Sequence, residues 1–263
     1  MAQKNMTDSG NLFAKKERKM TSQELKKEQE RINERIEKVA IDNHLCTDTM
    51  YPVFDGVFDE DSWLNAKLKV AWILKEPYDD FDEAGNPTGG GWAFRDCFEN
   101  QNSWKSSVWQ KITYVMHGFR NNQRWEDMPY IRNNIGMVNQ ELQNIVCLNL
   151  SKMPSKTYSN MSAVCNKYKT FWKGVVAEQL NVYAPDVIIF GYTFNCMRDS
   201  FPNAVEDKER SNEWVRYWKW KNDSNKILLD TYHPGRKGGK YVNKLIEALQ
   251  HASLDLEKTV IEN

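Results

Sequence analysis

Four short segments of this chain contain side chains that could do chemistry, and each lies at or near the end of a run that predicts a buried strand. They supply a carboxylate at Glu76, aromatic rings at residues 92 and 94, an amide at Asn149 and an imidazole at His233. In open α/β sheets, ligands bind beyond the carboxyl ends of the strands, where residues far apart in sequence converge. We therefore expect these segments to form one pocket.

The strands that would position these residues are four runs of β-branched and other apolar residues. They cover residues 68–74, 144–150, 186–191 and 226–231, and helical sequence lies at residues 107–116, 160–180 and 241–254. Strands that alternate with helices favour a parallel sheet covered on both faces. The predicted fold class is α/β, a three-layer α/β/α domain with a central four-stranded, mostly parallel sheet.

This domain is expected to span residues 46–255, with a short tail at 256–263. Residues 1–45 are predicted to hold a disordered start and then a charged helix, because Thr21 and Glu24 can form a capping box ahead of sequence rich in Lys, Glu and Arg. The apolar stripe of this helix is narrow, which favours a position on the domain surface.

Charge and cysteine content limit the classes of function. The 263 residues include 36 Lys and Arg against 36 Asp and Glu, so the net charge gives no general attraction to a polyanion. No apolar run approaches the roughly 20 residues of a membrane span, and the start is too charged for a secretory signal, so we expect a soluble, cytoplasmic protein. The five cysteines lack metal-binding spacing, and we expect reduced thiols, no metal, no cofactor and a monomer.

The segment at residues 208–244 is locally basic and contains six interleaved aromatic residues. They are Trp214, Tyr217, Trp218, Trp220, Tyr232 and Tyr241. Such a segment can bind nucleic acid through its cations and rings. It can equally be a solvated surface whose aromatic rings turn inward, and the sequence leaves both interpretations open.

The order of the motifs resembles the uracil-DNA glycosylase superfamily, of which this chain would be a divergent member. The family's Gly-Gln-Asp-Pro-Tyr corresponds to Leu-Lys-Glu-Pro-Tyr at residues 74–78, and its Gly-Leu-Ala-Phe to Gly-Trp-Ala-Phe at 91–94. Its strand ending Leu-Leu-Asn corresponds to Cys-Leu-Asn at 147–149, and its His-Pro-Ser-Pro-Leu to His-Pro-Gly-Arg-Lys at 233–237. The resemblance covers residues 68–249 and implies the family's fold.

The resemblance implies a monofunctional DNA glycosylase that flips a pyrimidine, uracil or a modified cytosine, out of DNA and hydrolyses its N-glycosidic bond. Glu76 would take the place of the carboxylate that activates water and stabilises positive charge on the sugar, and His233 would assist the departing base. The reaction needs an anion beside the sugar and a donor beside the base, because bond cleavage builds positive charge on the sugar and negative charge on the base. The product would be an abasic site, formed without a lyase step.

The resemblance also implies which residues bind the base. Asn149 would read its polar edge, because a side-chain amide both donates and accepts hydrogen bonds. Phe94 would stack on the extruded base, and Tyr78 would crowd the C5 position of the pyrimidine. Lys75 and Trp92 complete the predicted base-binding set.

DNA itself would be held by residues that follow two of the strands. The expected DNA-binding residues are Ser151, Lys152, Gly235, Arg236, Lys237 and Lys240. Backbone amides at glycines and cationic side chains ahead of a helix suit phosphate groups. The leucine that the family inserts into the duplex is missing, and Arg236 or Lys237 is the best substitute.

Departures from the family pattern leave other functions open. Glu76 replaces Asp, Lys75 replaces Gln, and the connection at residues 79–90 is longer and rich in carboxylates. These carboxylates could bind the polar substituents of a hydroxymethylated or glycosylated cytosine in foreign DNA, an activity suited to phage defence rather than DNA repair. The alternatives are a catalytically inactive nucleic-acid-binding protein of the same fold and an enzyme that acts on a free nucleoside.

Overall fold

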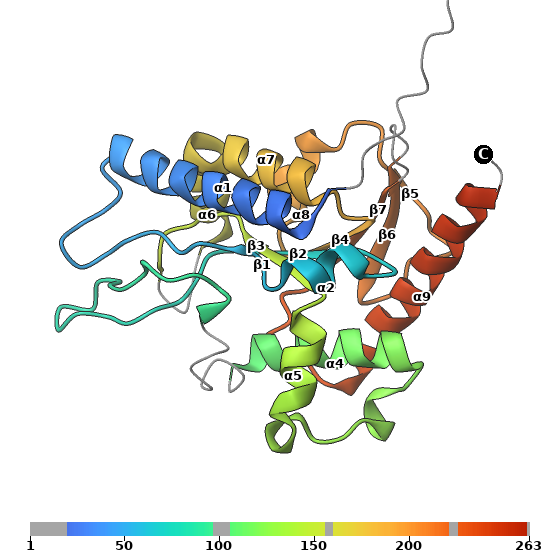
Figure 1. Ribbon diagram of the computed structural model, residues 1–263. Helices are drawn as coiled ribbons and strands as arrows, with labels where there is room; N and C mark the ends of the chain where they lie inside the picture. The colour runs from blue at the N-terminus through green and yellow to red at the C-terminus, as the bar shows by residue number, and fades with distance from the viewer. Residues whose placement is uncertain (1–19, 97–105, 156–159, 221–225, 262–263) are drawn as a thin grey trace, which may run out of the picture.

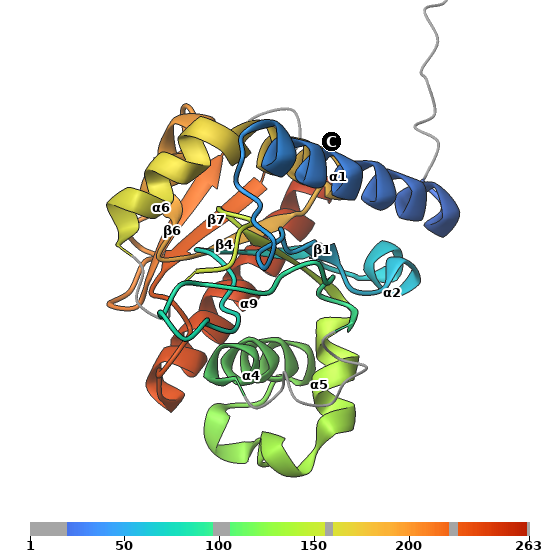
Figure 2. The ribbon, with the colours of Figure 1, turned by 90° about the vertical axis from the view of Figure 1, so that its left-hand side faces the viewer.

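The computed structural model describes residues 20–96, 106–155, 160–220 and 226–261 (Figure 1). A mixed sheet forms the middle layer, and helices cover both of its faces (Figure 2). The predicted disordered start at residues 1–19 lies outside the described residues. The three-layer α/β/α architecture expected from alternating strands and helices is confirmed.

The four predicted strands form the parallel centre of the sheet. They are β2 (Val70–Leu74), β3 (Ile145–Asn149), β4 (Val187–Gly191) and β7 (Lys226–Thr231), in the spatial order β3-β2-β4-β7. Every residue of β2, β3 and β4 is buried, as continuous apolar runs predict for parallel strands covered on both faces.

The expectation of a four-stranded sheet was wrong, because three further strands extend its edges to seven. β1 (Gly56–Val57) pairs antiparallel with β3, while β6 (Val215–Trp220) pairs antiparallel with β7 and β5 (Val205–Glu206) with β6. Two of these strands have only two residues, which is too short for a period-2 pattern to show. β6 lies in the basic and aromatic segment, where its Lys and Arg residues obscured a strand.

Helices are distributed over the two faces of the sheet (Figures 1 and 2). One face carries α1 (Ser22–Asp42), α6 (Met161–Lys167), α7 (Lys173–Tyr183) and α8 (Phe194–Met197), and the other carries α4 (Ser107–Asn121), α5 (Ile135–Leu142) and α9 (Gly239–Ile261). α6 continues into α7 through one π-helical turn, Tyr168–Trp172. The short elements are α2 (Glu60–Asn65) and the 3₁₀ turns Trp125–Asp127, Ile131–Asn133 and Arg198–Ser200.

The alternation of side chains along the central strands divides the core into two halves. In β2, Val70 and Trp72 pack with residues of α4, α5 and α9, whereas Ala71 and Ile73 pack with residues of α1, α6 and α7. α9 runs to Ile261, so the predicted tail at residues 256–263 is helical up to that residue.

The N-terminal charged helix, α1, packs along α7. Its capping box forms as predicted, with Glu24 bonded to Thr21 in both directions. Leu25, Ile32 and Ile36 are fully buried and belong to the core on the α7 side of the sheet. The helix is therefore an integral part of the outer layer, and Arg31 and Arg35 both form ion pairs with Glu178 of α7. Among the described residues, no helix has the length and apolar character needed to cross a membrane.

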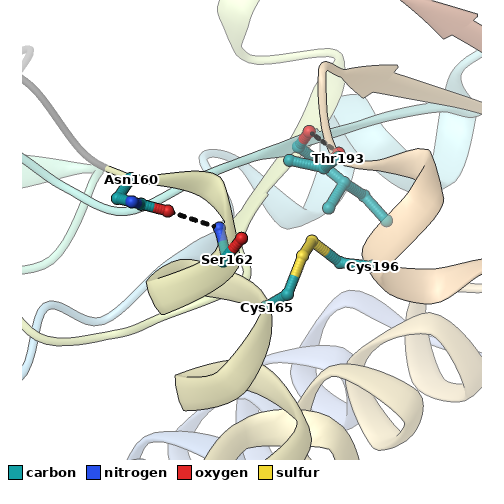
Figure 3. The surroundings of a disulfide bond; sticks show 6 residues. Asn160, Ser162, Cys165, Thr193 and Cys196 are labelled. Carbon is teal, nitrogen blue, oxygen red and sulfur yellow. Dashed lines mark hydrogen bonds between the residues drawn. A yellow bond between two sulfur atoms is a disulfide. The ribbon is translucent and has the colours of Figure 1, made fainter.

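A disulfide joins Cys165 of α6 to Cys196 of α8, with a Cα–Cα distance of 5.0 Å (Figure 3). The expectation of reduced thiols was wrong for these two residues, since the fold brings together cysteines that are 31 residues apart in sequence. Beside this bond, the hydroxyl of Thr193 donates to the carbonyl of Ile73 at 2.8 Å, which links the α8 segment to β2 (Figure 3).

Removing this cross-link should destabilise the protein. A loop of this length is expected to contribute about 3 to 4 kcal/mol to the free energy of unfolding, mainly by restricting the unfolded chain. We expect Cys165→Ser to lower the urea midpoint accordingly under non-reducing conditions, with Cys46→Ser, at a free cysteine, as the control. A reductant should lower the urea midpoint of the wild type to that of Cys165→Ser. Equal midpoints of these two proteins without a reductant would contradict the prediction.

Candidate active site

The carboxyl ends of the four parallel strands lie along one edge of the sheet. β2 ends in register with β3, and β4 ends in register with β7. Asn149 is the last residue of β3, while Glu76 and His233 each follow closely after β2 and β7. Neighbouring strands are about 4.8 Å apart, so the ends of β2 and β7, with β4 between them, are only about 10 Å apart. The fold thus brings the three predicted polar residues to the same edge.

Gly191, at the end of β4, draws the neighbouring loops together. A Cβ atom at this position would lie 2.9 Å from Cδ2 of Leu74 and 3.2 Å from Cδ of Pro234. The side chains of Leu74, at the end of β2, and of Pro234, after β7, therefore occupy the space that any larger residue would need. This close approach holds the loop that carries His233 toward the strand that leads to Glu76.

Glu76 is a buried carboxylate with a cationic partner. Its side chain is 1% exposed, and its Oε2 atom lies 3.1 Å from Nζ of Lys167, the last residue of α6. The ammonium group compensates the charge of a carboxylate that would otherwise be costly to bury. Sequence reasoning missed Lys167, because nothing in a helical Lys indicates which carboxylate it meets in the fold.

Lys75 links the carboxylate and the histidine electrostatically. Its side chain is half-buried, and loss of solvent lowers its pKa, while the charge of Glu76 acts in the opposite direction. The charge of Lys75 also contributes to lowering the pKa of His233. One ammonium group therefore lies within electrostatic reach of both predicted catalytic residues.

His233 is held in the neutral form. Burial, followed by the charges of Lys75 and Lys237, lowers its pKa to about 4 from the ordinary 6.5. Its Nδ1 atom accepts a hydrogen bond from the backbone N–H of Gly235 at 3.3 Å. A neutral ring whose Nδ1 accepts must carry its proton on Nε2, so the ring presents an N–H donor at neutral pH.

This shift predicts a pH dependence of stability. Between pH 6.5 and about 4 the unfolded chain binds a proton at His233 and the folded chain does not, so the free energy of unfolding should fall as the pH falls through this window. Urea midpoints at pH 7 and pH 5 should therefore differ more for the wild type than for His233→Gln. NMR titration of the ring protons gives the direct measurement, and a pKa near 6.5 for His233 would contradict the prediction.

Asn149 has a fixed backbone and an available side chain. Its N–H donates to Oδ2 of Asp55 at 2.6 Å, and its carbonyl accepts from Nζ of Lys152 at 2.8 Å. Among the described residues its side-chain amide has no hydrogen-bond partner, although the residue is only 2% exposed. An amide held in place by its backbone, with its own polar atoms unused, is suited to recognising a ligand.

Lys152 and Ser151 do not have the phosphate-binding roles predicted for them. Both are fully buried, and Nζ of Lys152 lies 2.7 Å from Oδ1 of Asp55 and 2.8 Å from Oε1 of Gln179. A side chain enclosed in this way cannot reach DNA. The chain after β3 turns into the protein rather than outward, and Asp55, whose tertiary role has no local sequence signal, is the reason that a lysine can be buried there.

The predicted base-stacking residues Phe94 and Trp92 are mostly covered by other side chains. Phe94 is 4% exposed and stacks on Phe58 and on Trp92, each with a centroid distance of 5.9 Å, while Trp109 meets its ring edge to face. Phe94 is thus a core residue in this structure, contrary to its predicted stacking role. Trp92 is half-buried, and its indole N–H donates to Asp79 at 2.7 Å.

The remaining predicted residues lie on the surface at the same edge. Tyr78 is 38% exposed after β2, and Arg236 is exposed in a left-handed conformation with φ of 59°. Lys237 lies over the ring of Tyr232 at 4.6 Å, and Lys240 pairs with Glu213 at 3.1 Å. The segment at residues 235–240, including Gly235, therefore presents cations to solvent where α9 begins.

The aromatic residues of the segment at 208–244 divide between the core and the surface. Tyr217, Trp218 and Tyr241 are buried, which supports the inward interpretation for these three. Trp214 and Trp220 are half-buried, and Tyr232 is 45% exposed. The described residues contain no group of three or more His, Cys, Asp or Glu side chains placed to hold a metal ion.

No model of a known protein family matches this chain. A search of curated proteins likewise gives no match. The class that the fold defines is a three-layer α/β/α protein with polar residues gathered at the carboxyl edge of its parallel strands.

Proposed function

We propose that this protein is a DNA glycosylase, related to the uracil-DNA glycosylase superfamily, that hydrolyses the N-glycosidic bond of an extruded pyrimidine. The observation that carries the proposal is the meeting of Glu76, Asn149 and His233 at one sheet edge, with Lys75 acting electrostatically on both Glu76 and His233. An anion, a neutral donor and an unused amide in one place are what this reaction needs.

In this mechanism the two sides of the breaking bond meet opposite electrostatic surroundings. Glu76 stabilises the positive charge that develops on the sugar and orients the attacking water. The Nε2–H group of His233 donates to the base as it departs with negative charge, and the nearby cation of Lys75 favours the same charge. Water adds to the sugar carbon, and its proton passes to Glu76 or to the solvent.

Asn149 and the surface cations would define the substrate. The Asn149 amide can both donate to and accept from the polar edge of a pyrimidine. Arg236, Lys237 and Lys240 would neutralise phosphates beside the extruded nucleotide, together with the backbone N–H groups of the same loop. This assignment makes DNA the partner and requires no cofactor.

A modified cytosine is a second candidate substrate, which one cavity favours. This cavity, of about 480 Å³, lies beside Lys167, the partner of Glu76, and is lined by Asp82 and Asn86 from the long connection. Its volume falls within the usual range of ligand pockets. The carboxylate and amide at its wall could bind hydroxyl groups on an enlarged base, as expected for a glycosylase directed at foreign DNA.

One assay tests the proposal and ranks the substrates. Purified protein is incubated with single strands and duplexes that contain uracil, hydroxymethylcytosine or glucosylated cytosine, and alkali then cleaves any abasic sites. We expect strand cleavage for at least one of these bases in the wild type and none above background in His233→Ala. Binding without cleavage by either protein would instead favour the inactive nucleic-acid-binding alternative.

A further inference from the structure

A second cavity, which we call the aromatic cavity, lies beside the candidate active site at the same edge of the sheet. Its volume is about 390 Å³, and its walls include Tyr192, Trp214, Arg216 and Tyr232. Tyr192 directly follows β4, Tyr232 directly follows β7, and Trp214 directly precedes the antiparallel strand β6. Tyr232 in the wall of the cavity is the residue before the predicted catalytic His233, so the Cα atoms of these two residues are about 3.8 Å apart.

Two exposed tyrosines flank this cavity. Tyr192 is 56% exposed and Tyr232 is 45% exposed. Tyr192 adopts φ of 67°, a conformation that is costly for a bulky side chain, and its N–H donates to the carbonyl of Thr231 at 2.7 Å. The fold thus holds two large rings toward solvent on neighbouring strands, the arrangement from which stacking platforms for bases are built.

The third ring, that of Trp214, packs behind Tyr232. Trp214 meets Tyr232 edge to face with a centroid distance of 5.6 Å. Its indole Nε1 is buried and has no hydrogen-bond partner among the described residues. Because this atom is enclosed, it does not face a ligand in the cavity, and Trp214 contributes by packing against Tyr232.

The charges around the aromatic cavity suit an anionic strand. Arg216 pairs with Asp230, and Lys240 pairs with Glu213, so both of these carboxylates are neutralised. Lys237 lies over the rings of Tyr232 and Trp214, at 4.6 Å and 5.8 Å, and has no carboxylate partner in the described parts of the chain. One uncompensated cation therefore remains at the rim, where a phosphate would approach.

We propose that the aromatic cavity binds an unpaired nucleobase, the neighbour of the nucleotide held at Glu76 and His233. A nucleobase has a flat π-face for the two exposed tyrosines, and its phosphate can meet Lys237. Two adjacent bases cannot both leave the stack without local opening of a duplex, so the substrate is single-stranded DNA or an opened duplex. Binding of a base in the aromatic cavity does not depend on the proposed glycosylase function. Only the statement that the adjacent nucleotide is held at Glu76 and His233 rests on that function.

The test measures binding and stacking separately from catalysis. Full-length Glu76→Gln protein is titrated into a fluorescent 12-nucleotide single strand that contains uracil with 2-aminopurine as its neighbour. Stacking of 2-aminopurine on the tyrosines should quench its fluorescence. In the same background, the double variant Tyr192→Ala/Tyr232→Ala should abolish this quenching and raise Kd roughly tenfold or more.

Two controls separate stacking from other effects. The double variant Tyr192→Phe/Tyr232→Phe keeps the rings and should bind the single strand like its parent. Tyr130→Ala removes a tyrosine that is 59% exposed and lies outside this cavity, and it should leave Kd and quenching unchanged. All replaced side chains are exposed, and far-UV circular dichroism verifies folding. Unchanged Kd and quenching in the double alanine variant, or no binding of the single strand by the parent, would overturn the inference. Quenching that depends on the tyrosines, without base release by the wild type, would retain the aromatic cavity and reject the glycosylase.

Discussion

Replacement of Glu76 by glutamine should lower the rate of base release by about a thousandfold or more. The amide has nearly the same shape but carries no negative charge, so it can neither stabilise positive charge on the sugar nor accept a proton from water. Lys167 is 40% exposed and can be solvated when its partner is lost, so the fold should be largely preserved. Single-turnover release of the base, followed by alkaline cleavage of the strand, gives the rate directly.

Two further variants show whether this loss belongs to Glu76 itself. Glu34→Gln removes an exposed carboxylate from α1 and should leave the rate of base release unchanged. Lys167→Gln retains the Glu76 carboxylate but removes its cationic partner, and should have an effect of intermediate size. If Glu76→Gln released the base as fast as the wild type, the carboxylate would have no catalytic role and the proposed mechanism would fail.

Replacement of Asp55 by alanine should lower the free energy of unfolding by about 3 to 5 kcal/mol. The change would leave the ammonium group of Lys152 buried without a counter-charge, which is the costliest way to break such a pair. It would also remove the acceptor for the backbone N–H of Asn149. Folded proteins are typically stable by only about 5 to 15 kcal/mol, so a large part of the stability would be lost.

Urea unfolding measures this effect, and a control variant together with a double variant assigns it to the buried pair. Asp48→Ala, at an exposed position in the segment between α1 and β1 that also contains Asp55, should shift the midpoint little. Asp55→Leu combined with Lys152→Met replaces both charges with apolar groups and should recover much of the stability lost in Asp55→Ala. A midpoint for Asp55→Ala equal to that of Asp48→Ala would show that the buried pair does not stabilise the fold.

The sequence predicted the centre of the fold because its strands are buried on both faces. Such strands appear as continuous apolar runs, and all four were found in the parallel part of the sheet. The sheet edges gave weaker signals. β1 and β5 are too short for a pattern, and β6 places Arg216 and Lys219 among its aromatic residues. The disulfide between α6 and α8 also depends on tertiary proximity, which cysteine spacing does not report.

The candidate site was predictable only where strand ends indicate function. Glu76, Asn149 and His233 all follow that rule, because parallel strands end at one edge. No comparable rule predicts the residues that pair with them in the fold, so Lys167 and Asp55 were missed. Lys152 follows a strand end and was assigned to phosphate, yet the chain there turns inward, which only the fold reveals.

The π-helical turn between α6 and α7 has a consequence for how this protein could have diversified. A π-helical turn contains one residue more than the α-helical turn it replaces, and each α-helical residue rotates the helix by about 100°. Deletion of a single codon there would restore a continuous helix and swing Lys167 to a different side, away from the carboxylate of Glu76. Length variation in this one turn would thus remove the counter-ion of the carboxylate without any substitution at the sheet edge.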